Sequence, residues 1–596
     1  MAICGFVGIV DAISTAAEPG RWRVVVADRP SLSIISSVLK MHTIMEHSVV
    51  AIQLITRSRQ PYPDMDAVYV LLPTAESVSR ALGDFEGGPS AAGTPLRKYA
   101  RAHLLFTGAL PESLLAHLRS STAAQYIRTI AQIFVEYNPI ESRVFLTTPS
   151  EQPFYALYSP HALHMVANEL NAAADRVLST VASLGIRPYV RYYRPPLSAA
   201  YVPSRPSVAA GDCTGTACPR IAEAMAARIQ RKLDEHFAQQ QGDRGQHRDR
   251  AAAADAAPSV IIVLDRSVDM CAPLLHDFSY QAIVHDLLDL ESGRKYIYEA
   301  EGADGQTRRV EAELTEDTDE LWKKFRHWHI ADVSQALADE FEQLVSKSEE
   351  IQIACKGHKM GVRQMKAALS GLPDFRRLQD AYSLHIDLAS KCLGIIKQGI
   401  LTTLSDFEQD LISGKDSLGE DVGREALEMR LISLLDDHTL DASDRIRILF
   451  IYLVCVNGGA ALDRRRLEEV PQCMSTNDKR AAVGLRRLGI QTDKGDEDEE
   501  LSESAERYTW SAVAPTDSSG RRPLVVPAVK QIVNAASGKG GVVIVYIAGG
   551  VTFSEMRAVY ELADQLNREI YIGSTHVITP RGFLDDLKSL HLEMLT

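Results

Sequence analysis

The chain of 596 residues has little of what marks secreted, metal-binding or membrane-spanning proteins. Its eight cysteines are scattered, and the closest pair, Cys213 and Cys218, has no second pair or histidines at zinc-ligand spacing nearby. This pattern favours reduced thiols over a disulfide framework or a zinc site. The longest strongly apolar run, residues 448–456, is far shorter than the roughly 20 residues that a membrane-spanning helix needs.

Acidic residues outnumber basic ones, with 78 Asp and Glu against 64 Lys and Arg, so the formal net charge is −14 and the isoelectric point is about 5.7. Such a balance disfavours nucleic acid or an anionic membrane as the main partner. The first ten residues, MAICGFVGIV, are apolar but lack preceding basic residues, which favours a buried N-terminal segment over a signal peptide. We therefore expect a cytoplasmic protein of several domains, with no nucleic-acid partner and only indirect contact with membranes.

Recognisable catalytic signatures are missing as well, including those of serine hydrolases, zinc proteases and kinases. The glycine-rich run SGKGG at 537–541 precedes a predicted strand, whereas a phosphate loop must follow its strand and lead into a helix. The pair Gly549 and Gly550 does follow a strand. However, bulky Phe553 replaces the third glycine of a dinucleotide fingerprint, and Glu555 would repel a phosphate. A tight turn is the simpler interpretation.

Two other polar groups also have simpler explanations than catalysis. Asp265 and Asp269 could form a carboxylate pair, but carboxylates at strand ends usually accept hydrogen bonds from the backbone of the next turn. Ser574 lies near His576, yet a nucleophile and its base need more geometry than closeness in sequence. We expect no catalytic residue, no metal site and no cofactor.

Strand and helix patterns alternate in the first quarter of the chain. Apolar runs predict strands at 24–26, 51–55, 67–72 and 103–106, and Thr74 can cap the helix that follows the third run. Strands separated by helical segments form βαβ units, so this region predicts an open parallel sheet.

Two later stretches of the chain, far apart in sequence, also contain short apolar runs. Residues 260–264 and 542–547 are short apolar runs typical of strands buried on both faces. After the second run, Thr552 and Glu555 form a capping box that starts a helix. Residues 311–490 are mainly helical in pattern.

Further features lie between these stretches. Helical periodicity covers residues 165–184 and 221–237, and a long helical hairpin is predicted from 332 to 398, interrupted near Pro373. The low-complexity residues 238–258 and the acidic residues 491–505 predict surface loops.

Three long stretches are distinctive: LDRSVDMCAPLLHDFSYQAIVHDLL at 264–288, IAGGVTFSEMRAVYELA at 547–563 and IYIGSTHVITPRGFLDDL at 570–587. They closely resemble the signatures of the SM family, the Sec/Munc syntaxin-binding proteins that control SNARE-mediated membrane fusion. The stretches SLHIDLASKCL and DFEQDLISGKD are most similar to the family's plasma-membrane secretory branch. The resemblance extends from about residue 22 to residue 590.

This resemblance implies an α/β fold with a helical region, arranged as a three-domain arch. The first α/β domain would span 1–148. The second would be discontinuous, with pieces at 149–265 and 495–596, and the mainly helical third domain at 266–494 would be inserted in it. The two short apolar strands at 260–264 and 542–547 fit such a shared parallel sheet.

The resemblance also implies a function. Family members are binding scaffolds and not enzymes: they regulate vesicle docking and fusion by gripping a syntaxin-type SNARE between the first and third domains. They can also hold a vesicle SNARE or the assembled SNARE complex and so template assembly. We expect a monomer that reaches the plasma membrane or secretory vesicles through syntaxin. A subunit of a vesicle tethering complex and a nucleotide-dependent α/β enzyme remain alternatives.

Specific residues follow from the resemblance. Asp28, Lys40 and Arg57 match residues of the syntaxin cleft in type, and Gln53 stands where related secretory members carry an acid. A family pocket for the syntaxin N-terminal peptide uses an aromatic residue and an acid.

Leu115 and Gln132 stand at the positions of that aromatic residue and that acid, and both depart from the pattern. Pro373 matches the proline at the bend of the helical hairpin, where it would hold the hairpin bent and cover the templating face.

Overall fold

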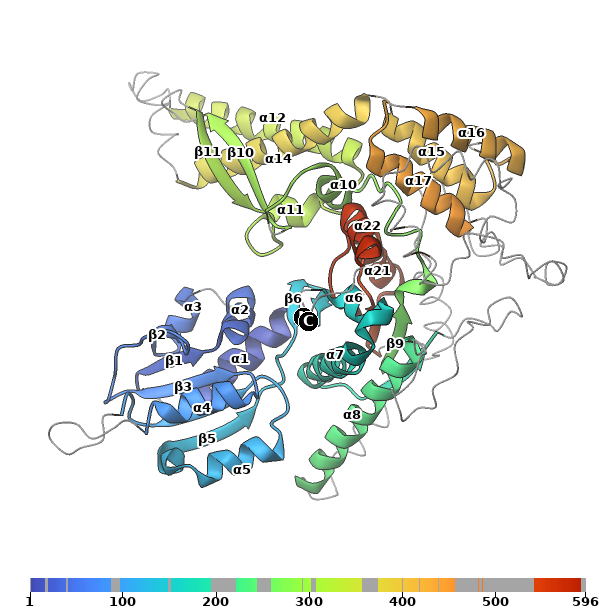
Figure 1. Ribbon diagram of the computed structural model, residues 1–596. Helices are drawn as coiled ribbons and strands as arrows, with labels where there is room; N and C mark the ends of the chain where they lie inside the picture. The colour runs from blue at the N-terminus through green and yellow to red at the C-terminus, as the bar shows by residue number, and fades with distance from the viewer. Residues whose placement is uncertain are drawn as a thin grey trace, which may run out of the picture.

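The computed structural model of the chain has three parts (Figure 1). A first sheet domain contains the N-terminal residues, a second sheet lies at the centre, and helices with a two-stranded hairpin lie beyond it. The first domain and the long helices α12 (Ile330–Cys355) and α14 (Pro373–Lys397) lie on the same side of the central domain. The structure describes residues 2–16, 20–38, 41–86, 97–147, 152–193, 221–243, 259–291, 293–301, 307–355, 373–398, 400–416, 418–437, 439–455, 481, 485 and 541–590.

The first sheet has five parallel strands in the order β2-β1-β3-β4-β5. Its strands are β1 (Arg23–Ala27), β2 (Val49–Leu54), β3 (Asp66–Leu71), β4 (Ala102–Phe106) and β5 (Ile127–Gln132). Its helices are α1 (Ala2–Ala16), α2 (Arg29–Val38), α3 (Met41–Glu46), α4 (Ala75–Gly83) and α5 (Glu112–Ser120). The four predicted strands are confirmed, while β5 was not predicted because its burial alternates along a half-exposed edge.

Buried apolar strands and a capped helix stabilise this domain. All five residues of β1 and all six of β3 are buried, so apolar side chains pack on both faces of the sheet. The predicted cap is present, since the Thr74 side chain accepts a hydrogen bond from the backbone N–H of Ser77. In α1, Ile9 and Ile13 are buried in one of these cores, as expected for a buried N-terminal segment.

The second sheet has six strands in the order β6-β7-β13-β12-β9-β8. Its strands are β6 (Asn138–Glu141), β7 (Val144–Leu146), β8 (Pro188–Tyr192), β9 (Ser259–Asp265), β12 (Val543–Ala548) and β13 (Ile570–Ser574). Strand β12 runs parallel to β9, with Val545 opposite Ile262, so the two distant pieces of chain share one sheet as predicted. The predicted capping box between Thr552 and Glu555 is also present.

The boundary between the two sheet domains lies earlier than predicted. Residues 138–146 form β6 and β7 of the second sheet, so the first sheet ends with β5 and the boundary falls at residues 133–137 instead of 148. The physical reason is a close fit between β7 and β13. Phe145 pairs with Gly573, where an added Cβ would lie 2.2 Å from the Phe145 ring.

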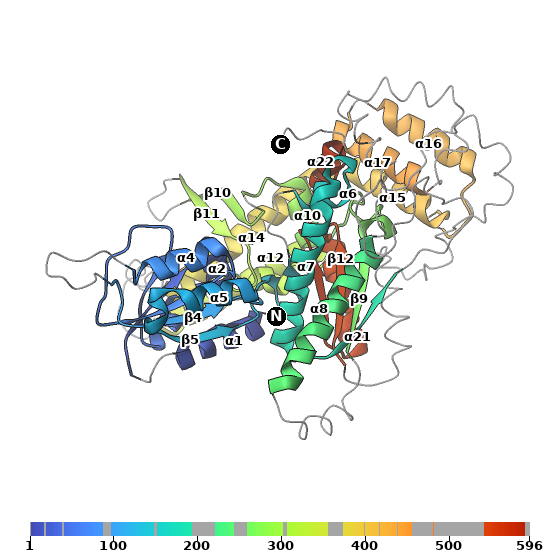
Figure 2. The same cartoon turned by 60° about the horizontal axis from the view of Figure 1, so that its bottom comes forward.

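Helices cover both faces of the second sheet. They are α6 (Pro153–Tyr158), α7 (Leu163–Leu184), α8 (Ile221–Asp243), α21 (Phe553–Leu566) and α22 (Pro580–Ser589), while α10 (Tyr280–Leu287) packs against α21 and the helices of the third part. Figure 2 shows α7 and α8 lying over the sheet that contains β9 and β12, with α21 behind it. Helix α8 continues to Asp243, so residues 238–243 of the predicted loop at 238–258 are helical, and the remainder lies outside the described residues.

The third part is mainly helical. Its helices are α11 (Glu320–Phe325), α12 (Ile330–Cys355), α14 (Pro373–Lys397), α15 (Ile400–Ser413), α16 (Arg424–Asp436) and α17 (Ala442–Cys455). Helices α12 and α14 correspond to the predicted hairpin, and Pro373 is the first residue of α14. An unpredicted antiparallel pair, β10 (Lys295–Glu301) and β11 (Thr307–Glu313), lies beside them.

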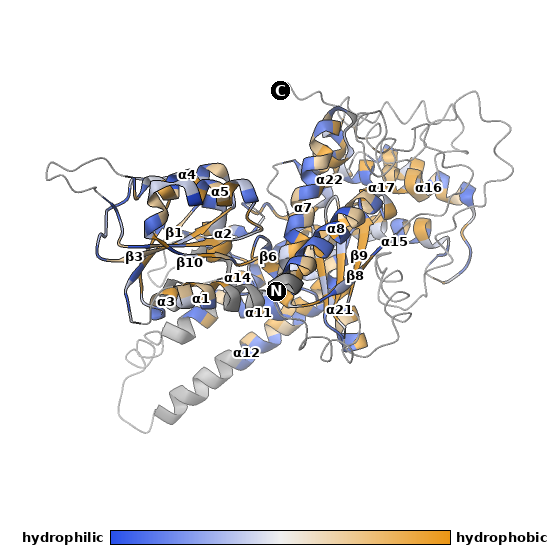
Figure 3. Cartoon of the chain, turned by 90° about the horizontal axis from the view of Figure 1, so that it is seen from below, coloured by the Kyte–Doolittle hydropathy of each residue, from blue (hydrophilic) through white to orange (hydrophobic). Residues whose placement is uncertain are grey.

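Apolar residues are concentrated in the strands and inner helix faces (Figure 3). Among the described residues, no helix combines the length and apolar character needed to cross a bilayer. The predicted acidic loop at 491–505 and most of the glycine-rich run at 537–541 lie outside the described residues.

Candidate binding surface

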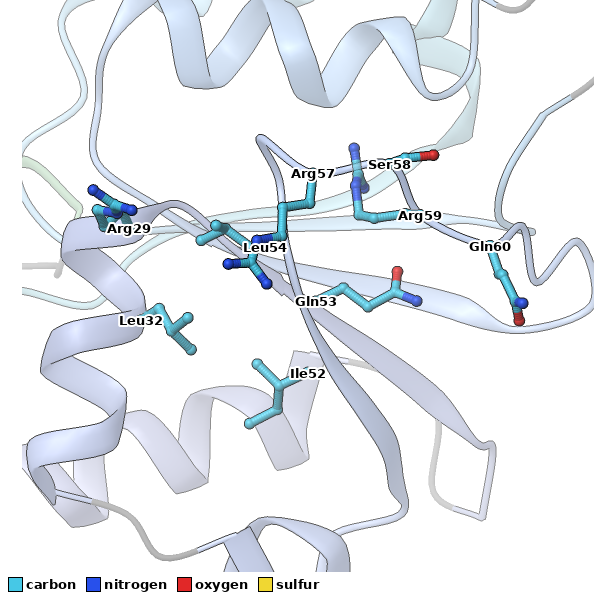
Figure 4. A pocket seen from close by; sticks show the side chains of 9 residues that line it. All are labelled: Arg29, Leu32, Ile52, Gln53, Leu54, Arg57, Ser58, Arg59 and Gln60. Carbon is cyan, nitrogen blue, oxygen red and sulfur yellow. The ribbon is translucent and has the colours of Figure 1, made fainter.

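A hollow of about 570 Å³ opens where β1 and β2 of the first sheet end (Figure 4). Strand β2 is an edge strand, so one side of this hollow is not covered by a further strand. The lining residues come from the start of α2, the end of β2 and the segment after it. They are Arg29, Leu32, Ile52, Gln53, Leu54, Arg57, Ser58, Arg59 and Gln60. In open α/β sheets, ligands bind at this carboxyl end of the strands.

The hollow combines apolar and basic side chains. Leu32, Ile52 and Leu54 are half-buried, while Arg29 and Arg57 are exposed. Neither of these two guanidinium groups forms an ion pair with a carboxylate of the described residues. An apolar surface beside two exposed positive charges suits an amphipathic helix whose polar face carries carboxylates.

The third arginine of the hollow, Arg59, has a structural role. Its two terminal nitrogens donate to Asp84 at 2.7 and 2.9 Å, and both side chains are almost fully buried. Asp84 also accepts from the Tyr69 hydroxyl at 2.7 Å and from Lys98 Nζ at 2.9 Å. Burial lowers the pKa of Arg59, but the bond to Asp84 outweighs it and raises the pKa overall. Arg59 is therefore held by Asp84 as part of the lining of the hollow, and its guanidinium group is not available to a partner.

This fixed network orients Gln53. The Tyr99 hydroxyl donates to Gln53 Oε1 at 2.7 Å and accepts from Arg59 Nη1 at 3.3 Å. Burial raises the pKa of Tyr99, so its hydroxyl keeps the proton that it donates. Gln53 lines the hollow with a neutral amide, where an acid would present a negative charge.

The predicted cleft residues are placed in different environments. Gln53 and Arg57 both line the hollow, whereas Asp28 is only 6% exposed. Asp28 accepts hydrogen bonds from Ser31 N at 2.9 Å, Leu72 N at 2.8 Å and Ser77 Oγ at 2.9 Å. It thereby ties the end of β1 to the residues after β3.

Lys40 and Arg29 complete the comparison with the expected cleft residues. Lys40 lies outside the described residues. Arg29 was not predicted, although a basic residue two positions after a buried strand was a visible signal in the sequence.

The two residues predicted for a peptide pocket lie at the opposite edge of the same sheet. Leu115 is half-buried on α5, and Gln132 is the exposed last residue of β5, the edge strand farthest from β2. Neither side chain supplies the aromatic ring or the negative charge that such a pocket would use. Any second surface here would therefore have to rely on apolar contact and neutral hydrogen bonds.

The corresponding edge of the second sheet is filled. Gly549 and Gly550 have φ angles of +98° and +103°, and side chains press against both. A Cβ on Gly549 would lie 2.7 Å from the Tyr158 ring, and one on Gly550 would lie 2.2 Å from Ile578. The Tyr158 hydroxyl donates to the Ala548 carbonyl at 3.0 Å and accepts from Arg266 N at 2.9 Å. The turn therefore has no room for a phosphate.

A buried ion pair completes this closure. Arg266 donates to Glu555 Oε1 at 2.7 Å and to Oε2 at 3.0 Å, and neither residue is more than 1% exposed. Burial lowers the pKa of Arg266, but Glu555 more than compensates and raises it. Glu555 Oε2 also accepts from the N–H of Thr552 at 2.9 Å, so one carboxylate caps α21 and neutralises Arg266. The sequence had predicted only the cap.

The other candidate catalytic groups have structural partners. Asp265 accepts from Ser267 N at 3.0 Å and Asp269 accepts from Ala272 N at 2.9 Å, as predicted for carboxylates at a strand end. Ser574 Oγ donates to the Ile547 carbonyl at 2.7 Å and does not pair with His576. Within the part of the chain that the structure describes, no group of three or more His, Cys, Asp or Glu side chains could hold a metal ion.

A family model described as "Sec1 family" matches residues 23–586 of the chain. A relative from Dictyostelium discoideum, protein transport protein sec1, is 28% identical, and the match covers 98% of this chain and 97% of that protein. Protein transport protein sec1 of Schizosaccharomyces pombe is 27% identical over 97% of this chain and 83% of that protein.

Solved structures show the same fold. The chain superposes on the Unc18 protein of the Unc18–syntaxin 1 complex from Monosiga brevicollis with a TM-score of 0.77 at 23% identity, covering 99% of both chains. It also matches the SM protein Vps45 in complex with the Qa SNARE Tlg2, with a TM-score of 0.67 at 18% identity over 99% of this chain and 98% of that chain.

Proposed function

Because this chain belongs to the Sec1 family, we propose that it is an SM-type regulator of vesicle docking and SNARE-mediated membrane fusion. Its direct partner would be a syntaxin-type SNARE. The names of its relatives concern protein transport, and the solved structures with the same fold include complexes with syntaxin 1 and with a Qa SNARE. The Sec1 names also favour the plasma-membrane secretory branch.

The single observation that carries the proposal is the hollow at the end of β2. A helix of the SNARE would lay its apolar face on Leu32, Ile52 and Leu54, and its carboxylates would face Arg29 and Arg57. An exposed ion pair contributes only about 0–1 kcal/mol, so the apolar contact would supply most of the affinity and the arginines would fix its register. Asp28 would not contact the SNARE but would hold the start of α2 in place through its hydrogen bond from Ser31 N.

A second surface would lie on the helical hairpin. Helices α12 and α14 lie on the same side of the central domain as the first sheet domain, so one partner could contact both. We place the templating of SNARE assembly, with a vesicle SNARE or the assembled complex, on this hairpin. Pro373 at the start of α14 cannot donate a backbone hydrogen bond, and it would help to keep the hairpin bent.

The outer edge around Leu115 and Gln132 would contribute little. A pocket without an aromatic ring or a charge would bind an N-terminal SNARE peptide weakly. Removal of that peptide from the SNARE should therefore change the affinity less than a change in the hollow does.

We further propose that the protein acts as a monomer and by binding alone, without catalysis. It would be recruited to the plasma membrane or to secretory vesicles through its SNARE. The alternative that it works inside a larger tethering complex is distinguished by its behaviour in cell extract. A tethering subunit co-purifies with several large proteins at fixed stoichiometry, whereas a monomeric regulator co-purifies with SNAREs.

Calorimetric titration of the full chain with the cytoplasmic domains of the same organism's syntaxins tests the proposal. Each SNARE is used with and without its N-terminal peptide, and as part of an assembled SNARE bundle. Submicromolar binding to one of them is expected and would identify the trafficking step. Failure of every syntaxin to bind, alone or assembled, would overturn the proposed partner while leaving the fold assignment intact.

A further inference from the structure

Two cysteines that are 184 positions apart in sequence meet at the junction between the second sheet and the helical part. The sulfur of Cys271 lies 3.9 Å from the sulfur of Cys455, and both residues are partly exposed. Cys271 follows β9 in the turn that leads towards α10, and Cys455 is the last residue of α17. We propose that Cys271 and Cys455 form a dithiol site that peroxide oxidises to an intramolecular disulfide.

The backbone on the Cys271 side is held in place. Its N–H donates to Asp269 Oδ1 at 3.1 Å, and its carbonyl accepts from Leu274 N at 2.8 Å and Leu275 N at 3.1 Å. These three hydrogen bonds hold the backbone of Cys271 in a tight turn, so its sulfur can move mainly by rotation about the side-chain bonds. The approach needed to form a disulfide of about 2.0 Å is therefore about 1.9 Å between the sulfurs.

The two segments that carry the thiols are also bound to each other. Arg447 of α17 donates from Nε to the Leu274 carbonyl at 2.8 Å, three residues after Cys271. His276 in the same turn contacts Glu408 of α15 at 2.7 Å and Asp444 of α17 at 3.6 Å. Because these buried contacts hold the turn against the helices, the two sulfurs stay near each other, which raises the effective concentration of one thiol at the other.

The chemistry needs only peroxide as oxidant. One thiolate attacks a peroxide oxygen, the O–O bond breaks, and a sulfenic acid and water form after proton transfer. The second thiolate then attacks the sulfenic sulfur, the S–S bond forms, the S–O bond breaks, and hydroxide leaves and is protonated to water. Two electrons pass from the thiols to peroxide, and a small dithiol reductant reverses the change.

A third cysteine provides an internal control. Cys392 of α14 is fully buried, and burial raises the pKa of its thiol to about 12. A thiol that is both inaccessible and protonated reacts slowly with peroxide. The proposal therefore predicts that the folded protein is oxidised at Cys271 and Cys455 while Cys392 stays reduced.

The test uses the full chain, treated with graded hydrogen peroxide and then alkylated with N-ethylmaleimide. Trypsin places Cys271 in the peptide 267–294 and Cys455 in the peptide 448–464, with no other cysteine in either. Mass spectrometry without reductant should detect these two peptides linked in most of the oxidised protein, and dithiothreitol should separate them. In C271S or C455S the link should disappear, and dimedone should label the remaining cysteine as a sulfenic acid.

The peptide linkage measured in the wild-type protein tests the proposal even if a serine variant fails to fold. The proposal would be overturned if both peptides were alkylated after a peroxide dose that oxidises glutathione, if both were over-oxidised without a link, or if a link formed only between two chains. A link that forms equally fast at Cys392 would also overturn it, because it would show that oxidation follows unfolding. Since the site does not involve the hollow, none of these outcomes bears on SNARE binding.

Discussion

The two parallel sheets of this chain differ at the same chemical position, the carboxyl ends of their strands. In the first sheet, the ends of β1 and β2 surround a hollow with two exposed arginines. In the second, the turn after β12 is packed against Tyr158 and Ile578, and a buried Arg266–Glu555 pair fills the space beside it. We propose that the same architecture serves for binding at the first sheet and for support at the second, depending on which side chains occupy the edge.

The two sheet edges also differ in whether Arg266 and Arg57 are paired with a carboxylate. Arg266 is paired at 2.7 Å and cannot meet a partner, whereas Arg57 is exposed and has no ion pair among the described residues. A buried pair contributes when both members are present and becomes costly when one is removed. An exposed charge contributes little to stability but can select a partner of opposite charge. Changes at the two edges should therefore appear in different measurements.

The largest effect is expected from Arg266→Met. Removal of the guanidinium leaves the Glu555 carboxylate buried without its partner, which should cost about 3–5 kcal/mol of stability. A clear fall in the thermal unfolding midpoint, measured by calorimetry, is the expected result. The double variant Arg266→Met, Glu555→Gln removes the unpaired charge and should recover part of the loss. Arg80→Met, which breaks the exposed Arg80–Glu76 pair, should have almost no effect; equal effects at both sites would contradict this account.

A pH effect comes next and tests the supporting region through His276. Burial and the charge of Arg447 oppose its protonation, but Glu408 and Asp444 outweigh them and raise the pKa of His276 to about 9. A histidine with a raised folded-state pKa contributes stability below its unfolded value of about 6.5, and this contribution is lost as pH rises through about 9. The loss is of the order of 3 kcal/mol.

The measurement is the thermal midpoint between pH 6 and pH 10 for the wild type and for His276→Gln. The wild type should lose stability towards pH 10, with Asp286 and Arg447 still paired at 2.9 Å in the same cluster. The variant should be less stable at pH 6 and should show a flatter profile. Parallel profiles for the two proteins would mean that His276 is not the titrating group.

Gly550→Ala should have a smaller effect. The new methyl group would lie 2.2 Å from Ile578 at a φ of +103°, so both crowding and backbone strain oppose it. Overpacking of this kind costs about 1–3 kcal/mol. Gly83→Ala is the matched control, because no atom lies within 4 Å of its added Cβ. A thermal midpoint that falls for Gly83→Ala but not for Gly550→Ala would show that the turn is not packed as described.

In the first sheet the expected effect is on binding and not on stability. Arg57→Glu should weaken the syntaxin-type SNARE about tenfold, which corresponds to about 1.4 kcal/mol, and should leave the thermal midpoint unchanged. Arg231→Glu, an equal charge change at an exposed position on α8, is the control and should bind like the wild type. If both variants lose the same affinity, then net charge and not the hollow is responsible.

The smallest expected effect is none at all. ATP, GTP and NAD at millimolar concentration should not shift the thermal midpoint, because Tyr158 and Ile578 occupy the place of a phosphate beside the glycine turn. A ligand present well above its dissociation constant would raise the midpoint by several degrees. Such a shift would reopen the interpretation as a nucleotide-dependent enzyme.

Local patterns in the sequence predicted the framework. The apolar runs gave the central strands of both sheets, and the capping residues Thr74 and Thr552 marked two helix starts. Two edge strands, β5 and β8, were missed because they are half-exposed and lack a continuous apolar run. The segment 138–146 was assigned to the wrong sheet, since its fit to β13 depends on Phe145 meeting Gly573 across more than 400 residues.

The sites were predicted less completely for the same reason. The resemblance led to Gln53 and Arg57, which do line one hollow, but it could not show that Asp28 is engaged in three internal hydrogen bonds. Nor could it show that Arg266 and Glu555 form a buried pair. Contacts between distant segments depend on the packed fold, and no local spacing encodes them.

The central claim is that the chain meets its partner at the open edge of the first sheet. Amide hydrogen exchange of the full chain, alone and with the bound syntaxin-type SNARE, tests it most directly. Binding should slow exchange in peptides from residues 49–60 and leave peptides from residues 548–556 unchanged. Protection at 548–556 without protection at 49–60 would contradict it.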